Sequence, residues 1–267
     1  MFDLSDKIVL VTGGAGLLGR MHSEAIVANG GKVIVGDIDI ESAEKTCKEI
    51  NELYSPAGPG FSYPIEKAFP IYLNVLDKTS IQNVLKTHSD INVLINNAAI
   101  DPKVTGTTGP SGSFESLSIN EWDLSVDVMM KGTFLCSQVF CPYFKKNGGG
   151  IVINISSDLG VIAPDQRIYD GSKKPITYSA AKHGIIGMTK YLATYYADSN
   201  IRVNSLSPGG VYVNQPEGFV KRLTNLIPVG RMANRDEYKG SIVFLCSNAS
   251  SYMTGHNLIV DGGRTVW

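Results

Sequence analysis

The segment Thr12-Gly13-Gly14-Ala15-Gly16-Leu17-Leu18-Gly19 lies directly after the apolar run IVLV at positions 8–11 and directly before a helical pattern. Gly14, Gly16 and Gly19 match the pattern G-x-G-x-x-G. At a strand-to-helix turn these glycines permit a tight turn, the close approach of a pyrophosphate and contact between helix and strand. The first turn of the helix adds free N–H groups and a partial positive charge for phosphates. The segment therefore predicts a βα unit that binds a nucleotide, with an ordinary glycine turn as the alternative.

An acidic residue follows the second apolar run. The run at positions 33–35 ends in Gly36-Asp37, eighteen residues after Gly19. A carboxylate there can accept hydrogen bonds from an adenosine ribose. It would also repel the 2′-phosphate of NADP, by about 4 kcal/mol for charges ~4 Å apart at an effective dielectric of ~20 before screening. No Arg or Lys occupies positions 13–19 or 38–40, although Arg20 and Lys32 are near in sequence. Asp37 thus favours NAD over NADP; a solvated Asp at a strand end is the alternative.

Five further apolar runs continue this alternation of strand and helix patterns. They lie at positions 71–73, 93–95, 151–155, 201–203 and 258–260, with helical spacing at 41–53, 122–144 and 180–197 between them. Most of the runs are continuous, as is typical of strands covered on both faces, and the β-α rhythm implies parallel strands. We therefore expect one α/β domain over residues 1–267, a Rossmann-like, doubly wound parallel sheet of about seven strands with helices on both faces. A closed barrel is the alternative. Irregular loops are expected at 55–67, 101–113 and 163–177.

The composition excludes several other classes of protein. The 267 residues carry 24 Lys+Arg against 25 Asp+Glu, so charge gives no reason to expect a nucleic acid or an anionic membrane as partner. No apolar run approaches the ~20 residues of a membrane span, and no basic leader opens the chain. The four Cys residues form no CxxC motif and the four His residues have no metal-like spacing. We expect reduced thiols, no metal site and a cytoplasmic protein.

Three residues further along supply groups for proton transfer. Tyr178 and Lys182 stand four residues apart on a helical pattern, so they share one face of the helix. A phenol has a pKa of about 10, and lowering it by ~3 units requires about 4 kcal/mol. A nearby ammonium, helped by the positive nicotinamide ring, is of the right size to supply that. Ser157 follows the run at 151–155 and can hold a substrate oxygen. This arrangement suits interconversion of an alcohol and a carbonyl compound, in which a proton and a hydride move together.

In these motifs and their order, the chain resembles the short-chain dehydrogenases/reductases over essentially its whole length. The shared features are Thr12-Gly13, Asn74-Val75, Asn96-Asn97-Ala98, Ser157, Tyr178-x-x-x-Lys182, Pro208-Gly209 and Val260-Asp261-Gly262-Gly263. The resemblance implies that Tyr178 is the acid/base, that Lys182 lowers its pKa and binds the nicotinamide ribose, and that Ser157 orients the substrate. The residues expected to contact the cofactor are Thr12, Gly13, Gly14, Gly16, Leu17, Leu18, Gly19, Asp37, Ile38, Asn74, Val75, Asn97, Ala98, Ala99, Tyr178, Lys182, Pro208, Gly209 and Val211.

The chain departs from the family pattern at four places. Ala99 replaces a usual Gly, and Leu17 stands at a glycine of the usual T-G-x-x-x-G-x-G turn, so that the turn is nearer to that of the sugar-nucleotide branch. The Thr often found a few residues after Pro208-Gly209 is missing. Met129 occupies the position of a catalytic Asn that anchors a proton-relaying water. Because a thioether cannot anchor that water, the relay is not expected in the family's form, whereas the chemistry of Tyr178 is unaffected.

A second Y-x-x-x-K motif, from Tyr169 to Lys173, lies closer to Ser157. Gly171 destabilises a helix there and Pro175 blocks its continuation, so we assign the catalytic pair to Tyr178 and Lys182. Positions 165–177 then form an insertion over the active site. The residues expected to contact substrate are Ser157, Asp158, Gln166, Tyr169 and Asn214, with Arg167, Gln215, Glu217 and Phe219 as further candidates.

The sequence thus predicts an NAD-dependent oxidoreductase that acts on a secondary alcohol or ketone. The insertion and Asn214-Gln215-Pro216-Glu217 are similar to short-chain dehydrogenases of sugar pathways, including those linked to nonulosonic acids, which implies a polyhydroxylated substrate. Two alternatives stay open: an NADPH-dependent 3-oxoacyl reductase, and a nucleotide-binding subunit without turnover. We interpret Tyr191, Tyr195 and Tyr196 as core or subunit contacts, and the resemblance implies a homotetramer or a dimer.

Overall fold

The computed structural model describes residues 1–54, 66–100 and 113–267, and the strands in these ranges form one seven-stranded parallel sheet. In chain order they are β1 (Ile8–Thr12), β2 (Lys32–Asp37), β3 (Ala68–Tyr72), β4 (Val93–Asn96), β5 (Gly150–Ile155), β6 (Ile201–Pro208) and β7 (Asn257–Val260). Their spatial order is β3-β2-β1-β4-β5-β6-β7. The order reverses between β1 and β4, and ligands bind outside the carboxyl ends of strands at such a switch point. The predicted doubly wound, Rossmann-like sheet is confirmed.

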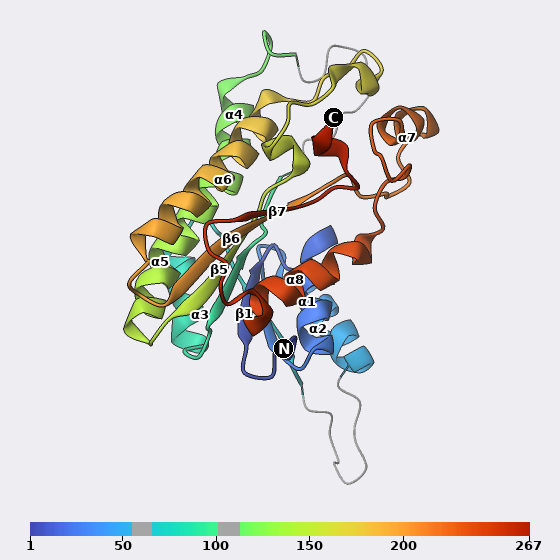
Figure 1. Ribbon diagram of the computed structural model, residues 1–267. Coiled ribbons are helices and arrows are strands. Elements are labelled where there is room, and N and C mark those ends of the chain that lie inside the picture. The colour runs from blue at the N-terminus through green and yellow to red at the C-terminus, as the bar shows by residue number, and fades with distance from the viewer. Residues whose placement is uncertain (55–65, 101–112) are drawn as a thin grey trace.

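Helices cover both faces of the sheet (Figure 1). They are α1 (Leu17–Ala28), α2 (Ile40–Tyr54), α3 (Lys78–Thr87), α4 (Ile119–Val126), α5 (Gly132–Lys146), α6 (Ile176–Tyr195), α7 (Glu217–Thr224) and α8 (Lys239–Cys246). Successive strand residues point to opposite faces, so Val9 and Val11 pack with α1, α2 and α8, whereas Leu10 packs with α3 and α5. The continuous apolar runs of the sequence are therefore explained by two cores, one on each face.

Two elements differ from the pattern expected from sequence. Strand β3 starts three residues before the run at 71–73 and includes Pro70, which an edge strand tolerates because one side of it carries no partner strand. The helical pattern at 122–144 is interrupted by a π-helical turn, η1 (Asp127–Lys131), between α4 and α5. Most of the expected loops at 55–67 and 101–113 lies outside the described residues.

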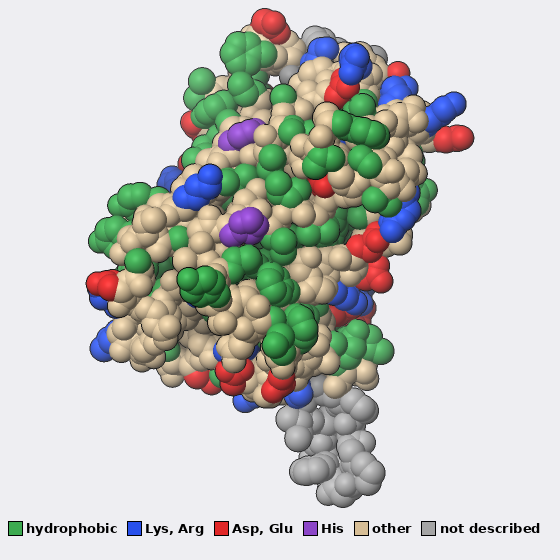
Figure 2. Space-filling model, viewed as in Figure 1, with side chains coloured by type: hydrophobic (Ala, Val, Ile, Leu, Met, Phe, Trp, Pro, Cys, Tyr) green, Lys and Arg blue, Asp and Glu red, His purple; other side chains and the backbone are tan. Residues whose placement is uncertain are grey.

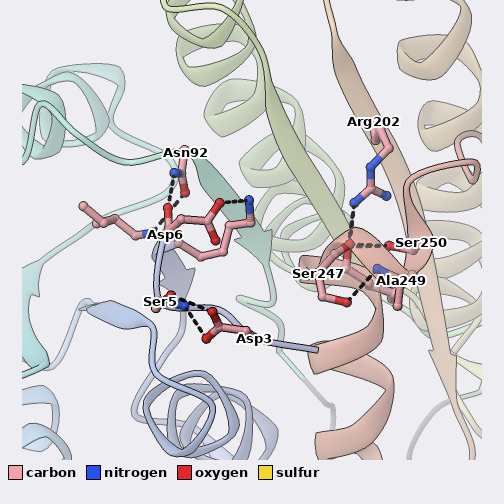
Figure 3. Close-up of polar contacts among 11 residues, drawn as sticks. Asp3, Ser5, Asp6, Asn92, Arg202, Ser247, Ala249 and Ser250 are labelled. Carbon is pink, nitrogen blue, oxygen red and sulfur yellow. Dashed lines mark hydrogen bonds and ion pairs between the residues drawn. The ribbon is translucent and has the colours of Figure 1, made fainter. Parts of the chain in front are cut away.

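Polar contacts close the amino ends of the strands (Figure 3). The Asn92 amide donates to the Asp6 carbonyl at 2.8 Å and accepts from the Ile8 N–H at 2.9 Å. On β6, the Arg202 guanidinium donates to the carbonyl oxygens of Leu245 and Ser247, both at 3.2 Å. Backbone groups at this end are therefore satisfied within the chain, and the cavity described below opens at the other end.

Charged side chains of both signs are distributed over the face of the molecule seen in Figure 2. Lys and Arg side chains are interspersed with Asp and Glu on the face seen in Figure 2, without a broad region of one sign. In the described part of the chain, none of the helices is both long and apolar enough to cross a membrane.

Candidate active site

A cavity of about 1230 Å³ opens at the carboxyl ends of the strands. Gly13, Asp37, Asn97 and Ser157, which end or follow β1, β2, β4 and β5, belong to its wall. Pockets for one drug-sized ligand usually measure about 300–1,000 Å³. This cavity is therefore large enough for two ligands at once, one beside the glycine turn and one beneath α7.

Glycines shape the first turn because side chains do not fit there. A Cβ on Gly19 would lie 2.2 Å from the Gly13 carbonyl oxygen, and one on Gly13, whose φ is +60°, would lie 2.9 Å from the Ala98 Cα. Helix α1 then begins after Gly16 without a side-chain cap. The N–H groups of its first turn are thus left for an outside acceptor, and a diphosphate fits this cradle.

Thr12 and Asn97 tie the ends of β1 and β4 together beneath the turn. The Thr12 hydroxyl oxygen accepts from the N–H groups of Asn97 and Ala98, both at 3.0 Å. The Asn97 side chain donates to the carbonyl oxygens of Thr12 and Gly13 at 3.0 and 2.9 Å. These bonds fix the width of the groove at the switch point.

Asp37 lies in the cavity wall at the end of β2. Its carboxylate accepts from the N–H groups of Ala15 and Asp39, both at 3.1 Å, so its oxygens are fixed beside the glycine turn. Arg20 does not offset this charge, because its guanidinium pairs with Glu24 at 3.1 Å and with Glu49. Lys32 lies at the opposite end of β2. The negative charge of Asp37 at this end of the cavity is therefore not neutralised by either cation.

Ser157, Tyr178 and Lys182 all line the same cavity. Ser157 follows β5, and α6 carries Tyr178 and Lys182 one turn apart. The Lys182 ammonium donates to the Ile155 carbonyl at 2.8 Å and lies 5.6 Å from the centre of the Tyr178 ring. Lys182 is buried, so its charge acts on Tyr178 in a medium that screens poorly.

The insertion places a second cation, the Lys174 ammonium, beside Tyr178. The Lys174 ammonium lies 4.2 Å from the centre of the Tyr178 ring and borders the cavity. The Gln166 amide fixes the Lys174 backbone, accepting from its N–H at 2.9 Å and donating to its carbonyl at 3.2 Å. This position was not expected from sequence, although Lys174 stands four residues before Tyr178, the mirror image of the Lys182 spacing.

The second Y-x-x-x-K motif does not form a helical pair. A short 3₁₀ helix, η3 (Gln166–Tyr169), ends at Asp170, whose φ is +55°, and Gly171 follows at +85°. Helix α6 begins only after Pro175. Lys173 is exposed, whereas Tyr169 lines the cavity and contacts the Phe219 ring of α7 at 5.6 Å.

The structure separates the other expected site residues into three groups. Residues that line the cavity are Gly13, Gly16, Leu17, Leu18, Asp37, Ile38, Asn74, Val75, Asn97, Ala98, Ala99, Asp158, Tyr169, Pro208, Gly209 and Val211. Thr12, Gly14 and Gly19 lie behind the wall and shape it. Gln166, Arg167 and Asn214 do not line the cavity: the Gln166 amide is engaged by Lys174 and Arg167 pairs with Asp165 at 2.7 Å, so their contact with substrate stays a prediction.

Met129 is fully buried in η1 and packs against Ala181 and Ile185 of α6. Tyr178 and Met130 border the same apolar cluster. Where the family pattern has a polar relay residue, this chain therefore has an apolar side chain that packs against the helix carrying Tyr178.

Arg264 is a cavity-lining residue that the sequence did not single out. It lies in the short 3₁₀ helix η6 (Arg264–Val266) near the C-terminus and pairs with Asp158 at 2.6 Å, with both side chains at most 5% exposed. The feature of the sequence that could have indicated Arg264 is its position directly after Asp261-Gly262-Gly263. Within the described ranges, no cluster of His, Cys, Asp and Glu has the arrangement of a metal site.

Comparison with known proteins agrees with this geometry. Residues 15–265 match the family described as Enoyl-(Acyl carrier protein) reductase. Trans-4-hydroxycyclohexanecarboxylate dehydrogenase of Sinomonas cyclohexanicum is 33% identical over 98% of this chain and 94% of the relative. The 3-oxoacyl-[acyl-carrier-protein] reductase of Thermotoga maritima is 32% identical over 98% and 99%. The D-arabinitol 2-dehydrogenase of Candida albicans is 31% identical over 100% and 95%.

Solved structures give the same result. A short chain dehydrogenase from Leptospira borgpetersenii with bound NAD⁺ superposes with a TM-score of 0.81 at 33% identity, covering 98% of this chain and 94% of the other. A protein from Agrobacterium tumefaciens assigned as 2-deoxy-D-gluconate 3-dehydrogenase, with bound NADP, gives 0.82 at 27% identity over 100% and 99%. The chain belongs to the short-chain dehydrogenase/reductase family, and it is an oxidoreductase that uses a nicotinamide nucleotide.

Proposed function

We propose that this protein is an NAD-dependent oxidoreductase that interconverts a secondary alcohol and a ketone on a small polyhydroxylated molecule. One observation carries the proposal: Ser157, Tyr178 and Lys182 line a single cavity whose far end holds the carboxylate of Asp37. Ser157, Tyr178 and Lys182 supply the groups for proton transfer at a carbinol carbon. The Asp37 carboxylate can accept hydrogen bonds from the adenosine ribose.

In the oxidation direction, Tyr178 takes the hydroxyl proton of the substrate. The phenolate required for this is stabilised by the buried Lys182 ammonium, held in place by the Ile155 carbonyl at 2.8 Å. Lys174, 4.2 Å from the ring centre on the insertion side, adds positive potential at the same ring. Ser157 positions the substrate, and a bound NAD would supply the hydride acceptor for the carbinol carbon.

NAD is favoured over NADP because Asp37 lies where a 2′-phosphate would be placed. Its carboxylate is fixed beside the glycine turn by the Ala15 N–H, and Arg20 is engaged by two glutamates. Relatives are known with either nucleotide, so Asp37 carries this part of the proposal.

The relatives support an alcohol substrate of small size. One acts on a cyclohexane ring with a hydroxyl and one on a pentitol, as their names state. A reductase of 3-oxoacyl chains is the second candidate, because a relative of that name is 32% identical over nearly the whole chain. NADPH preference and reduction of acyl thioesters would distinguish it. A nucleotide-binding subunit without turnover would bind NADH and exchange no hydride with any alcohol or ketone.

We also propose that the protein self-associates in a reducing compartment such as the cytoplasm. Tyr191 and Tyr195 stack at 5.8 Å on α6 while each remains more than 60% exposed, as expected of a face that a second subunit covers. All four cysteines are buried as free thiols.

The test is turnover of NAD with a panel of cyclic alcohols and polyols by wild type and Tyr178→Phe. We expect a loss of at least 10³-fold in kcat for Tyr178→Phe, because the acid/base is removed, with NADH affinity within about threefold of wild type. Tyr169→Phe is the matched control and should retain turnover. Complete loss with Tyr169→Phe, together with an active Tyr178→Phe, would refute the assignment.

A further inference from the structure

Two aromatic side chains meet in the wall of the cavity beneath α7. Tyr169 belongs to η3 in the insertion, and Phe219 belongs to α7. Their ring centres lie 5.6 Å apart, with 40° between the ring planes. Both residues line the cavity and both stay partly exposed. We call these two rings the aromatic pair, and they form a surface that neither η3 nor α7 could supply alone.

An apolar cluster holds the aromatic pair in place. Ile168, Leu223 and Met232 are each at most 6% exposed, and both aromatic side chains pack against the cluster that they form. The same three residues also line the cavity. An apolar wall offers a ligand no hydrogen bonds, so it favours a side of the substrate that carries only C–H groups.

Arg222 of α7 ties η3 to α7. Its Nε donates to the Ile168 carbonyl at 2.9 Å, and its Nη2 pairs with Asp170 Oδ2 at 3.3 Å. Ile168 and Asp170 are the chain neighbours of Tyr169, so the guanidinium fixes the backbone on both sides of that ring. The positions of the two rings are therefore set by contacts within the chain. Such a preformed surface binds a rigid ligand with little loss of conformational freedom.

Resting on the proposed function, we infer that Tyr169 and Phe219 bind the C–H face of a ring, so that the substrate is a cyclic alcohol or ring polyol and not an open-chain polyol. A saturated ring with hydroxyls around its edge has an apolar face, which a flat aromatic surface covers well. An edge hydroxyl is then directed to Ser157 and Tyr178, which line the same cavity.

An open-chain polyol fits this wall less well for two reasons. It carries a hydroxyl on each carbon, so it has no continuous C–H face, and some of its hydroxyls would lie unpaired against the aromatic pair. Its freely rotating bonds must also be fixed on binding, whereas those of a ring are fixed beforehand.

The experiment compares ring alcohols with open-chain alcohols that have the same numbers of carbon atoms and hydroxyl groups. Cyclohexane-1,2-diol is paired with hexane-2,3-diol, and myo-inositol is paired with a hexitol. We expect wild type to oxidise the better of the two rings with a kcat/KM roughly 10-fold or more above that of its open-chain partner.

Substitutions of Phe219 test whether the flat ring makes this distinction. Phe219→Leu stays apolar but loses the flat surface, so the ratio of ring to open chain should fall to about threefold or less. The fall should come through a higher KM for the ring, with kcat within about threefold of wild type. Phe219→Tyr keeps the ring and should keep the ratio. Tyr252→Ala removes a fully exposed aromatic side chain outside the cavity wall and is the control that should also keep it.

The outcomes separate the inference from the function on which it rests. Equal efficiency of wild type with ring and open chain, or a preference for the open chain, overturns the inference while the oxidoreductase stands. A wild-type preference for rings that both Phe219→Leu and Tyr169→Leu retain also overturns it, because the aromatic pair would not be its source. Absence of turnover with every secondary alcohol and ketone overturns the proposed function and the inference with it. Thermal unfolding and NADH binding establish that each variant is folded, and if one leucine variant is not, the wild-type ratio and the other variant decide.

Discussion

At the scale of the residue, the proposed preference for NAD rests on Asp37. Its carboxylate is fixed by the N–H groups of Ala15 and Asp39 and lies half-buried in the cavity wall. Solvent reduces the repulsion of a 2′-phosphate well below the unscreened value of about 4 kcal/mol. We therefore expect Asp37→Ala to gain roughly 10-fold in NADPH affinity and to lose several-fold in NADH affinity, measured by titration of nicotinamide fluorescence.

Asp39→Ala is the control for this prediction. Asp39 carries the same charge two residues away, but its side chain bonds Ser42 and does not line the cavity. Its cofactor preference should stay that of wild type. Wild-type protein that binds NADPH as tightly as NADH would contradict the role of Asp37. It would favour the second candidate function, reduction of 3-oxoacyl chains.

The sequence predicted those site residues whose neighbours are local. The glycine turn follows a strand directly, and Tyr178 and Lys182 are one helical turn apart, so spacing alone brings each set together. Arg264 could not be found in this way, because its partner Asp158 is 106 residues away and only the folded chain joins them. Gln166 was assigned to substrate because it lies in the insertion at 165–177, whereas a local contact with Lys174 uses both ends of its amide.

At the scale of the element, the segment at 170–175 between η3 and α6, which we call the strap, holds Lys174 beside Tyr178. The two bonds from Gln166 to the Lys174 backbone close it. We expect Gln166→Leu to loosen the strap, which would raise the KM for the alcohol roughly 10-fold and leave NADH affinity unchanged. Steady-state kinetics with the best alcohol, together with NADH titration, measure the two effects.

Gln138→Leu is the matched control, because the Gln138 amide accepts from the exposed Lys78 ammonium at 2.8 Å, on the surface of α5. It should leave both constants at wild-type values. If Gln166→Leu lowers the melting temperature without changing KM, the strap only stabilises the fold and has no effect on substrate.

Element types followed from periodicity, but two boundaries did not. Apolar runs, most of them continuous, identified the seven strands of the described residues, since strands buried on both faces need such runs. The start of β3 was missed because Pro70 argues against a strand unless the strand is known to be at an edge, which is a property of the whole sheet. The π-helical turn at Met129 was missed because α4 and α5 share one apolar pattern across it.

At the scale of the whole molecule, His22 makes stability depend on pH. It is fully buried in α1, and neither ring nitrogen has a hydrogen-bond partner among the described residues. Burial lowers the pKa of His22 from 6.5 to about 3. The folded state thus resists protonation that the unfolded state accepts, so stability is complete above about pH 6.5 and is lost progressively as the pH falls toward 3.

Between pH 7 and pH 5 this single group should cost about 2 kcal/mol of the free energy of unfolding. We expect His22→Met, which fills a similar volume without a titrating group, to lose about 2 kcal/mol less than wild type over that interval, measured by urea unfolding followed by tryptophan fluorescence. His183→Met, which removes an exposed histidine on α6, should keep the wild-type dependence. The same slope of stability against pH in wild type and His22→Met would contradict this prediction and would show that His22 does not account for the acid sensitivity.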